Sequence, residues 1–230
     1  MTNAPVPHSD LLVPPLEPGV FPMEDWGAVC MTGRDLPNFL QRLSTIRFEP
    51  FDPLRVPLGA LLNAKSVVLA LGFFEPFGSD KTANGIRYWM PRRNLQDAMD
   101  HLEKFHFAED FQQQVEAETS LVAVSGWTQV LPSLPRPEVG RLWSGEVGGQ
   151  TVSGWEDASW PDLLWLAVPK AGREPLLNAL QGQGAALHGA TLFEYYRSKY
   201  ALVEVGRELS ERTLILETGL DHAVDSQKGC

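Results

Sequence analysis

A repeated order of strand, proline and amphipathic helix constrains the fold of this chain more than any other feature of its sequence. The strand-like run 86–93 precedes the helical pattern of 94–105, and the strand-like run 162–170 precedes that of 173–182. Aligning the prolines that end the two strands gives a period of 78 residues. Two related α+β units explain this repeat better than one long series of alternating strands and helices, although a proline near the first helical turn also occurs by chance.

Patterns in the first half predict one complete unit of this kind. Residues 26–33 have the apolar character of a strand ended by a glycine, and residues 34–45 place large apolar side chains at helical spacing. Residues 58–74 predict a pair of strands joined by a turn at Asn63-Ala64-Lys65. Together with the repeat, these patterns predict an α+β fold of two pseudo-symmetric units.

Prolines mark the expected boundaries. Five of them fall in the first 20 residues, which show little periodicity, so we expect residues 1–20 to be an extended N-terminal arm. A second cluster of three prolines lies between residues 132 and 137. We therefore expect the first unit to span 21–130 and the second to span 131–230.

Several classes of function are disfavoured. The net charge of −10 repels phosphate backbones on average, so we expect no direct nucleic-acid binding. The chain has no G-x-S-x-G, H-E-x-x-H, Walker or G-x-G-x-x-G motif, and its five histidines are scattered, so no metal site is predicted. It has neither an apolar run of the ~18 residues needed for a membrane span nor a secretory signal pattern. We expect a cytoplasmic protein with no membrane contact.

The last three residues, Lys228, Gly229 and Cys230, form a candidate reactive site. A neighbouring cation favours the thiolate form of a cysteine, and a glycine lets a partner approach the backbone closely. The alternative is a terminal cysteine without a role.

The segment that leads to Cys230 has a distinctive order of motifs. It contains G-R-E-L at 206–209, T-L at 213–214, E-T-G-L-D-H-A-V at 217–224 and K-G-C at 228–230. Upstream lie E-D-W at 24–26, T-G-R-D at 32–35, F-L-Q at 39–41 and N-A-K at 63–65. This order resembles the YgfZ proteins, relatives of the glycine-cleavage T-protein (aminomethyltransferase), in which a G-x-E-L…T-L-x-x-E-x-G-L-x-x-A-V segment precedes the signature K-G-C-Y-x-G-Q-E.

The resemblance implies a folate-binding fold of two T-protein-type, ferredoxin-like units. It also implies tetrahydrofolate as cofactor and a role in making or repairing iron–sulfur proteins, including those that modify tRNA. Cys230 would be the functional residue of the signature, and Trp26 would line the folate site. The other positions that match the family's binding motifs are Asn63, Lys65, Arg197, Lys228 and Gly229.

The sequence also departs from the family pattern. Arg47 stands where the family has an aspartate, Lys199 replaces an acid that would bind the pterin ring, and Ala201 replaces a glycine. Ser66 replaces the glycine of the hairpin. A lysine ammonium donates hydrogen bonds but accepts none, so Lys199 cannot take the place of that acid. The chain ends within the signature, so by this comparison we expect it to lack the family's C-terminal β-barrel domain.

Two main hypotheses follow from the sequence. In the first, a YgfZ-like protein binds a folate between its two halves and supports the assembly or repair of iron–sulfur proteins, which would be its partners. In the second, a divergent or truncated relative has lost the folate and acts as a protein-interaction module. An aminomethyltransferase ranks last, because the stretch after the hairpin, 68–71, has no carboxylate. No pair of titratable groups offers a general acid and base within sequence reach, so we do not expect this chain to be a catalyst by itself.

Overall fold

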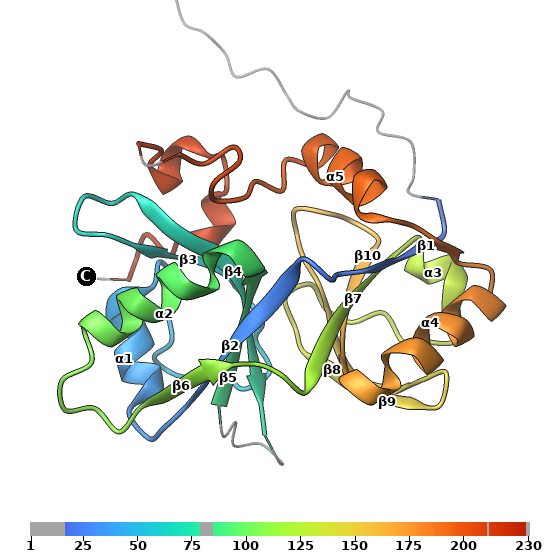
Figure 1. Cartoon of the computed structure of the whole chain (residues 1–230), viewed down its shortest axis with the longest axis horizontal. Helices are drawn as coiled ribbons and strands as arrows, with labels where there is room; N and C mark the ends of the chain where they lie inside the picture. Colours follow the sequence, from blue (N-terminus) through green and yellow to red (C-terminus); the bar gives the residue numbers. More distant parts are fainter. Residues whose placement is uncertain (1–16, 79–84, 211, 229–230) are drawn as a thin grey trace, which may run out of the picture.

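Two β-sheets organise the protein (Figure 1). The computed structural model describes residues 17–78, 85–210 and 212–228. One sheet has five strands in the order β3-β4-β5-β2-β6, and the other has six in the order β11-β1-β7-β10-β9-β8. The predicted α+β class is therefore confirmed.

The elements are joined by connections of different lengths, and the longest precede β3, β8 and η4. The five-stranded sheet and its helices comprise β2 (Trp26–Thr32), α1 (Leu36–Leu43), β3 (Leu58–Leu62), β4 (Val68–Phe77), β5 (Gly85–Pro91), the 3-10 turn η2 (Arg92–Asn94), α2 (Leu95–Lys104) and β6 (Gln112–Val115). The six-stranded sheet and its helices comprise β1 (Gly19–Pro22), β7 (Thr119–Ser125), α3 (Trp127–Val130), β8 (Trp143–Val147), β9 (Gln150–Glu156), β10 (Leu163–Pro169), the 3-10 turn η3 (Lys170–Gly172), α4 (Arg173–Gly182) and β11 (Ala186–Leu187). The chain continues through α5 (Ala190–Lys199), η4 (Ile215–Glu217) and η5 (Asp221–Ala223).

The 78-residue repeat is present in the structure. The series β5-η2-α2 and β10-η3-α4 agree in the length of every element, and each element of the second series is displaced by 78 residues from its counterpart. Pro91 and Pro169 adopt nearly the same backbone angles, with φ of −53° and −51° and ψ of 133° and 138°. The two halves are therefore pseudo-symmetric copies of one arrangement.

The two sheets face each other, and helices cover their outer faces. Buried side chains from both sheets, such as Phe73 and Trp165, form the core between them. The helices α1 and α2 cover the five-stranded sheet, whereas α3 and α4 cover the six-stranded sheet (Figure 1). Because successive side chains of a strand point to opposite faces, β10 sends Trp165 into the core between the sheets and Leu164 and Leu166 under the helices. This explains why β10 is a continuous apolar run in the sequence.

The change from one sheet to the other does not occur at the proline cluster. The chain leaves the five-stranded sheet after β6 and enters the six-stranded sheet at β7, so residues 119–130 lie in the second sheet's layer rather than with the first unit. The prolines between 132 and 137 lie in the connection from α3 to β8. Of the expected arm, residues 1–16 lie outside the described part of the chain, and Gly19 and Val20 belong to β1.

The C-terminal segment returns from α5 to the five-stranded sheet. The hydroxyl of Thr45 donates a hydrogen bond of 2.6 Å to the carbonyl oxygen of Ala223, and the amide of Asp225 donates one of 2.8 Å to the carbonyl oxygen of Thr45. Leu209, Leu220 and other apolar residues of this segment contribute to the core between the sheets. None of the described helices is both long and apolar enough to span a membrane.

Candidate functional site

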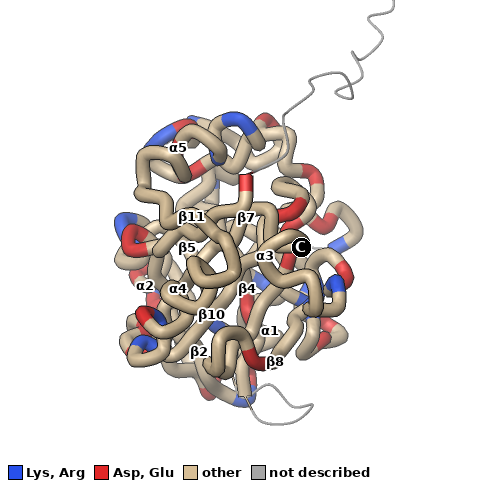
Figure 2. Tube along the Cα trace, turned by 90° about the vertical axis from the view of Figure 1, so that its right-hand side faces the viewer, with Lys and Arg blue, Asp and Glu red and all other residues tan. Residues whose placement is uncertain are grey.

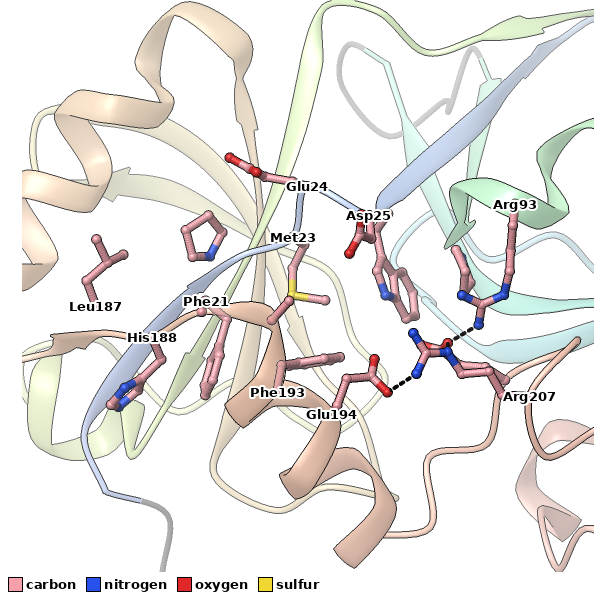
Figure 3. A pocket seen from close by; sticks show the side chains of 16 residues that line it. Phe21, Met23, Glu24, Asp25, Arg93, Leu187, His188, Phe193, Glu194 and Arg207 are labelled. Atoms are coloured by element: carbon pink, nitrogen blue, oxygen red, sulfur yellow. Dashed lines mark hydrogen bonds and ion pairs between the residues drawn. The ribbon is translucent and has the colours of Figure 1, made fainter.

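A cavity of about 370 Å³ opens beside the connection between β1 and β2 (Figure 3). One wall is formed by this connection, and others by the first residues of α5 and by the loop that follows α5. The residues that line the cavity are Phe21, Pro22, Met23, Glu24, Asp25, Trp26, Pro91, Arg93, Leu187, His188, Gly189, Ala190, Phe193, Glu194, Glu204 and Arg207. We call this space the central cavity.

Aromatic and apolar side chains form the inner part of the central cavity. Phe21 and Phe193 meet edge to face, with their ring centroids 5.6 Å apart. The Trp26 ring stacks on Phe73, with centroids 6.2 Å apart, and lies 5.2 Å from the ring of Trp165. Trp26 is 5% exposed, so the core holds the indole in place while it contributes to the wall. A planar organic ring would find apolar contacts on this side.

A network of charged side chains adjoins the cavity next to α5, and Figure 3 shows Arg93, Glu194 and Arg207 of this network. Along the chain trace of Figure 2, basic and acidic positions alternate in the region of α5. The members of the network are Arg93, Arg197, Arg207, Glu194, Glu204 and Glu208. The Glu204 carboxylate lies at the centre, where it pairs with Arg93 and lies 3.3 Å from Nε of Arg207. Its side chain is only 4% exposed. Three guanidinium groups match three carboxylates, so the network adds no net charge to the site.

Arg197 stabilises this network from within. Its guanidinium donates hydrogen bonds of 2.9 Å to Glu194, 2.8 Å to Glu208 and 3.1 Å to the carbonyl oxygen of Leu202. Burial by itself lowers the pKa of a guanidinium, but the bonds to Glu208 and Glu194 outweigh burial and raise the pKa of Arg197. Arg197 is therefore a permanent cation that holds the loop after α5 against the helix.

Asp25 differs from the other acids around the cavity. Its carboxylate makes no hydrogen bond or ion pair with a described residue, whereas Glu194 and Glu204 are paired with arginines and Glu24 pairs with Arg173 at 2.6 Å. In Figure 3 the Asp25 side chain lies between Met23 and Arg93. The cavity thus offers a ligand one carboxylate that can accept hydrogen bonds without breaking an existing ion pair.

The sequence-predicted residues lie at different points of the fold. Trp26 lines the central cavity. Arg197 does not line it but binds two residues that do. Asn63 and Lys65 lie in the turn between β3 and β4, where the Asn63 side-chain oxygen accepts the amides of Lys65 and Val67 at 2.8 Å and 3.1 Å. Asn63 therefore shapes the hairpin.

Lys228, the one described residue of the signature near the chain end, contacts the residue that follows α1. The Lys228 ammonium donates a hydrogen bond to the carbonyl oxygen of Ser44, and the side chain is buried. Gly229 and Cys230 lie outside the described residues, so the structure places neither of them. Within the described chain, no residue after Arg207 lines the central cavity.

The departures from the family pattern have structural counterparts. Arg47 forms an ion pair of 3.1 Å with Asp225, which ties the C-terminal segment to the residues after α1. The Lys199 ammonium lies 5.8 Å from the ring centroid of Tyr195, a side chain that is exposed. Ser66 and Ala201, which stand where the resemblance has glycines, both have a left-handed backbone, with φ of 61° and 54°.

Sequence patterns did not reveal most of the charged residues at the cavity. These residues come from η2, from α5 and from the loop after α5, and only the fold brings them together; they are Arg93, Glu194, Glu204 and Arg207. One signal was present, because opposite charges recur within 194–208, at the spacing of one helical turn or in an adjacent loop. His188, whose ring lies 5.3 Å from that of Phe21, had no such signal.

The comparisons with known proteins concern the fold. No protein-family model matches the sequence, and no curated protein matches it. Among solved structures, the chain is similar to the glycine cleavage system aminomethyltransferase T from Bartonella henselae, with a TM-score of 0.73 and 17% identity. That match covers 87% of this chain and 55% of the other, so the chain spans little more than half of that structure's length.

A heterotetrameric sarcosine oxidase from Corynebacterium sp. U-96, in complex with pyrrole 2-carboxylate, also matches, with a TM-score of 0.47 and 11% identity over 71% of this chain and 82% of that one. This second superposition is too distant to support an argument. The first shows that the chain has a fold like that of the glycine-cleavage T-protein, which agrees with the pseudo-symmetric α+β units expected from the sequence.

Proposed function

We propose that the central cavity binds a reduced folate and that the chain is a YgfZ-like protein. The observation that carries this proposal is the pairing of an aromatic wall, which includes Trp26, with the uncommitted carboxylate of Asp25 in one cavity. The T-protein-like fold supports the proposal, and so does the sequence resemblance described above. The cavity volume of about 370 Å³ is within the usual range for small-molecule sites.

The chemistry of a pterin fits the two parts of the cavity. A pterin is planar and apolar on its faces, and its 2-amino group and ring N–H donate hydrogen bonds along one edge. A carboxylate accepts such donors in pairs, so Asp25 supplies the acceptor that Lys199 cannot supply. Arg93 and Arg207 have side chains that are 37% and 42% exposed, which leaves them accessible to the carboxylates of a folate's glutamyl tail.

We assign to this chain a binding role in the assembly or repair of iron–sulfur proteins, including those that modify tRNA. Cys230, with Lys228 and Gly229, would act in that role through contacts with a partner protein or the folate's one-carbon unit. The two units, which meet at the change of sheet between β6 and β7, would hold the folate between them.

Calorimetric titration of the full chain with tetrahydrofolate tests the proposal. We expect a heat of binding that saturates at tetrahydrofolate concentrations up to ~1 mM, because this range covers the dissociation constants of weakly bound small molecules. Asp25→Asn keeps the size of the side chain but replaces one acceptor oxygen with a donor, so it should weaken binding at least tenfold. Asp97→Asn is the matched control, because Asp97 is an exposed acid on α2, away from the cavity.

The outcome separates the two hypotheses from the sequence. No heat with the unmodified chain, or equal affinity in the Asp25 and Asp97 variants, would overturn binding at this cavity. A chain that fails the titration yet captures purified iron–sulfur assembly proteins would instead support the protein-interaction module.

A further inference from the structure

A second cavity, of about 340 Å³, lies on the other side of the β1–β2 connection. It shares only Met23, Glu24 and Trp26 with the central cavity. Its remaining lining residues come from β5, η2, β7, η3 and α4, and they are Trp89, Arg92, Thr119, Ser120, Leu121, Lys170, Arg173 and Glu174. The proposed folate site uses none of these eight. We call this space the axial cavity.

The two pseudo-symmetric units contribute equivalent cations to the axial cavity. Arg92 is the first residue of η2 and Lys170 is the first residue of η3, and the two positions are related by the 78-residue repeat. The preceding prolines have matching backbone angles, so both turns leave their strands in the same way. Because the pseudo-symmetry brings both turns to one cavity, one cation from each half faces the same space.

The ion pairs around the axial cavity leave a positive excess. The charge of Arg173 is already paired, since its guanidinium lies 2.6 Å from the carboxylate of Glu24 and 4.0 Å from that of Glu174. The Arg92 Nε donates a hydrogen bond of 2.7 Å to the carbonyl oxygen of Glu24, and no carboxylate of the described residues forms an ion pair with Arg92. The Lys170 ammonium has no partner among the described residues. Three cations and two acids line the cavity, although the whole chain carries −10.

Neutral donors and an apolar wall complete the axial cavity. Thr119 and Ser120, at the start of β7, are half-buried, and their hydroxyls make no hydrogen bond with a described residue. Met23, Trp26 and Trp89 form the apolar side. An oxyanion accepts hydrogen bonds from guanidinium, ammonium and hydroxyl groups together, and arginine binds it with two parallel donors.

We propose that the axial cavity binds the oxyanion of a small organic molecule, a carboxylate or a phosphate, between Arg92 and Lys170. The volume exceeds that of the oxyanion alone, so the apolar part of the ligand lies against Met23 and the two tryptophans. Asp25 does not line this cavity, so the oxyanion site can be tested separately from the proposed folate site, although both cavities are lined by Met23, Glu24 and Trp26.

Calorimetric titrations at constant ionic strength test the axial site, with inorganic phosphate and benzoate as probes. Constant ionic strength is needed because salt screens contacts with exposed cations. We expect saturable binding of at least one probe, and at least tenfold weaker binding in the double variant Arg92→Gln/Lys170→Gln. Binding of phosphate alone identifies a phosphate ligand, and binding of benzoate alone identifies an aromatic carboxylate.

Two controls make the test specific. The double variant Arg34→Gln/Lys104→Gln removes the same charges from exposed positions and should leave probe binding unchanged. Asp25→Asn should also leave it unchanged, which separates this site from the folate proposal. Failure of both probes to bind, or equal loss of affinity in the two double variants with unchanged circular dichroism, would overturn the proposal.

Discussion

Replacing Ala201 with glycine should stabilise the protein, because Ala201 occupies a glycine-favouring position at the end of α5. Its φ is 54°, in the left-handed region. The amide of Leu202 bonds to the carbonyl oxygen of Arg197 at 2.8 Å, and that of Ala201 to the carbonyl oxygen of Ser198 at 3.4 Å. These two bonds form a Schellman motif, in which the residue at this position is usually glycine.

The magnitude follows from two opposing terms. A left-handed backbone costs a residue with a Cβ roughly 1–2 kcal/mol, a cost that glycine does not have. Glycine loses more backbone freedom on folding, which costs about 0.5–1 kcal/mol relative to alanine. The Ala201 methyl group is exposed, so its removal sacrifices little packing. The net gain for Ala201→Gly is about 0.5–1 kcal/mol.

Chemical and thermal denaturation measure this gain. A gain of that size should raise the melting temperature by about 1–4 °C in a chain of this length. Ala64→Gly is the matched control, since Ala64 is exposed and does not have a positive φ, and it should lose about 0.4–1 kcal/mol. If Ala201→Gly destabilises the protein as much as Ala64→Gly does, the left-handed cap at α5 is refuted.

Two further predictions concern titration. Burial raises the pKa of Glu75 above its ordinary value of 4.5, against the opposing effects of Arg87 and hydrogen bonds, so the folded state binds a proton more tightly than the unfolded state does. The Glu75 contribution to stability is therefore greatest below pH 4.5 and is lost as the pH rises through the folded-state pKa. Urea denaturation should show this loss in the unmodified chain but not in Glu75→Gln, and parallel stability profiles would contradict it. The amide of Phe107 and the guanidinium of Arg42 lower the pKa of Glu109 to about 2. Titration by nuclear magnetic resonance should find that value and a higher one in Arg42→Gln, whereas an unchanged value would exclude the ion pair.

The first half of the fold was predictable because its patterns are local. The strand at 26–33, the helix after it and the hairpin at 58–74 appear in the structure as β2, α1 and the β3–β4 pair. In β10, both faces are buried, which gives a long apolar run that is easy to recognise. The strands β8 and β9 were not recognised, since several exposed or small residues interrupt their apolar pattern.

The sheet boundary and most of the site could not be predicted for a common physical reason. The link between β6 and β7 has no proline or glycine, because the chain passes to the second sheet without a turn that needs one. The prolines after α3 lie in a loop within one unit. The network around Glu204 depends on pairs such as Arg93 and Glu204, whose proximity only the folded chain creates.

The strand β1 has a consequence for the order in which the chain acquires its structure. Phe21 pairs with Ala123 on β7, and Gly19 pairs with Ala186 on β11, so β1 is inserted between two strands that are made much later during synthesis. The strand pairings of the five-stranded sheet all lie between residues 26 and 115, so these pairings can form first. Pairings between distant segments form slowly. The strand β1 can therefore pair with β7 only after residues 119–125 have been synthesised and with β11 only after residues 186 and 187, so we expect the second sheet to be completed after the first.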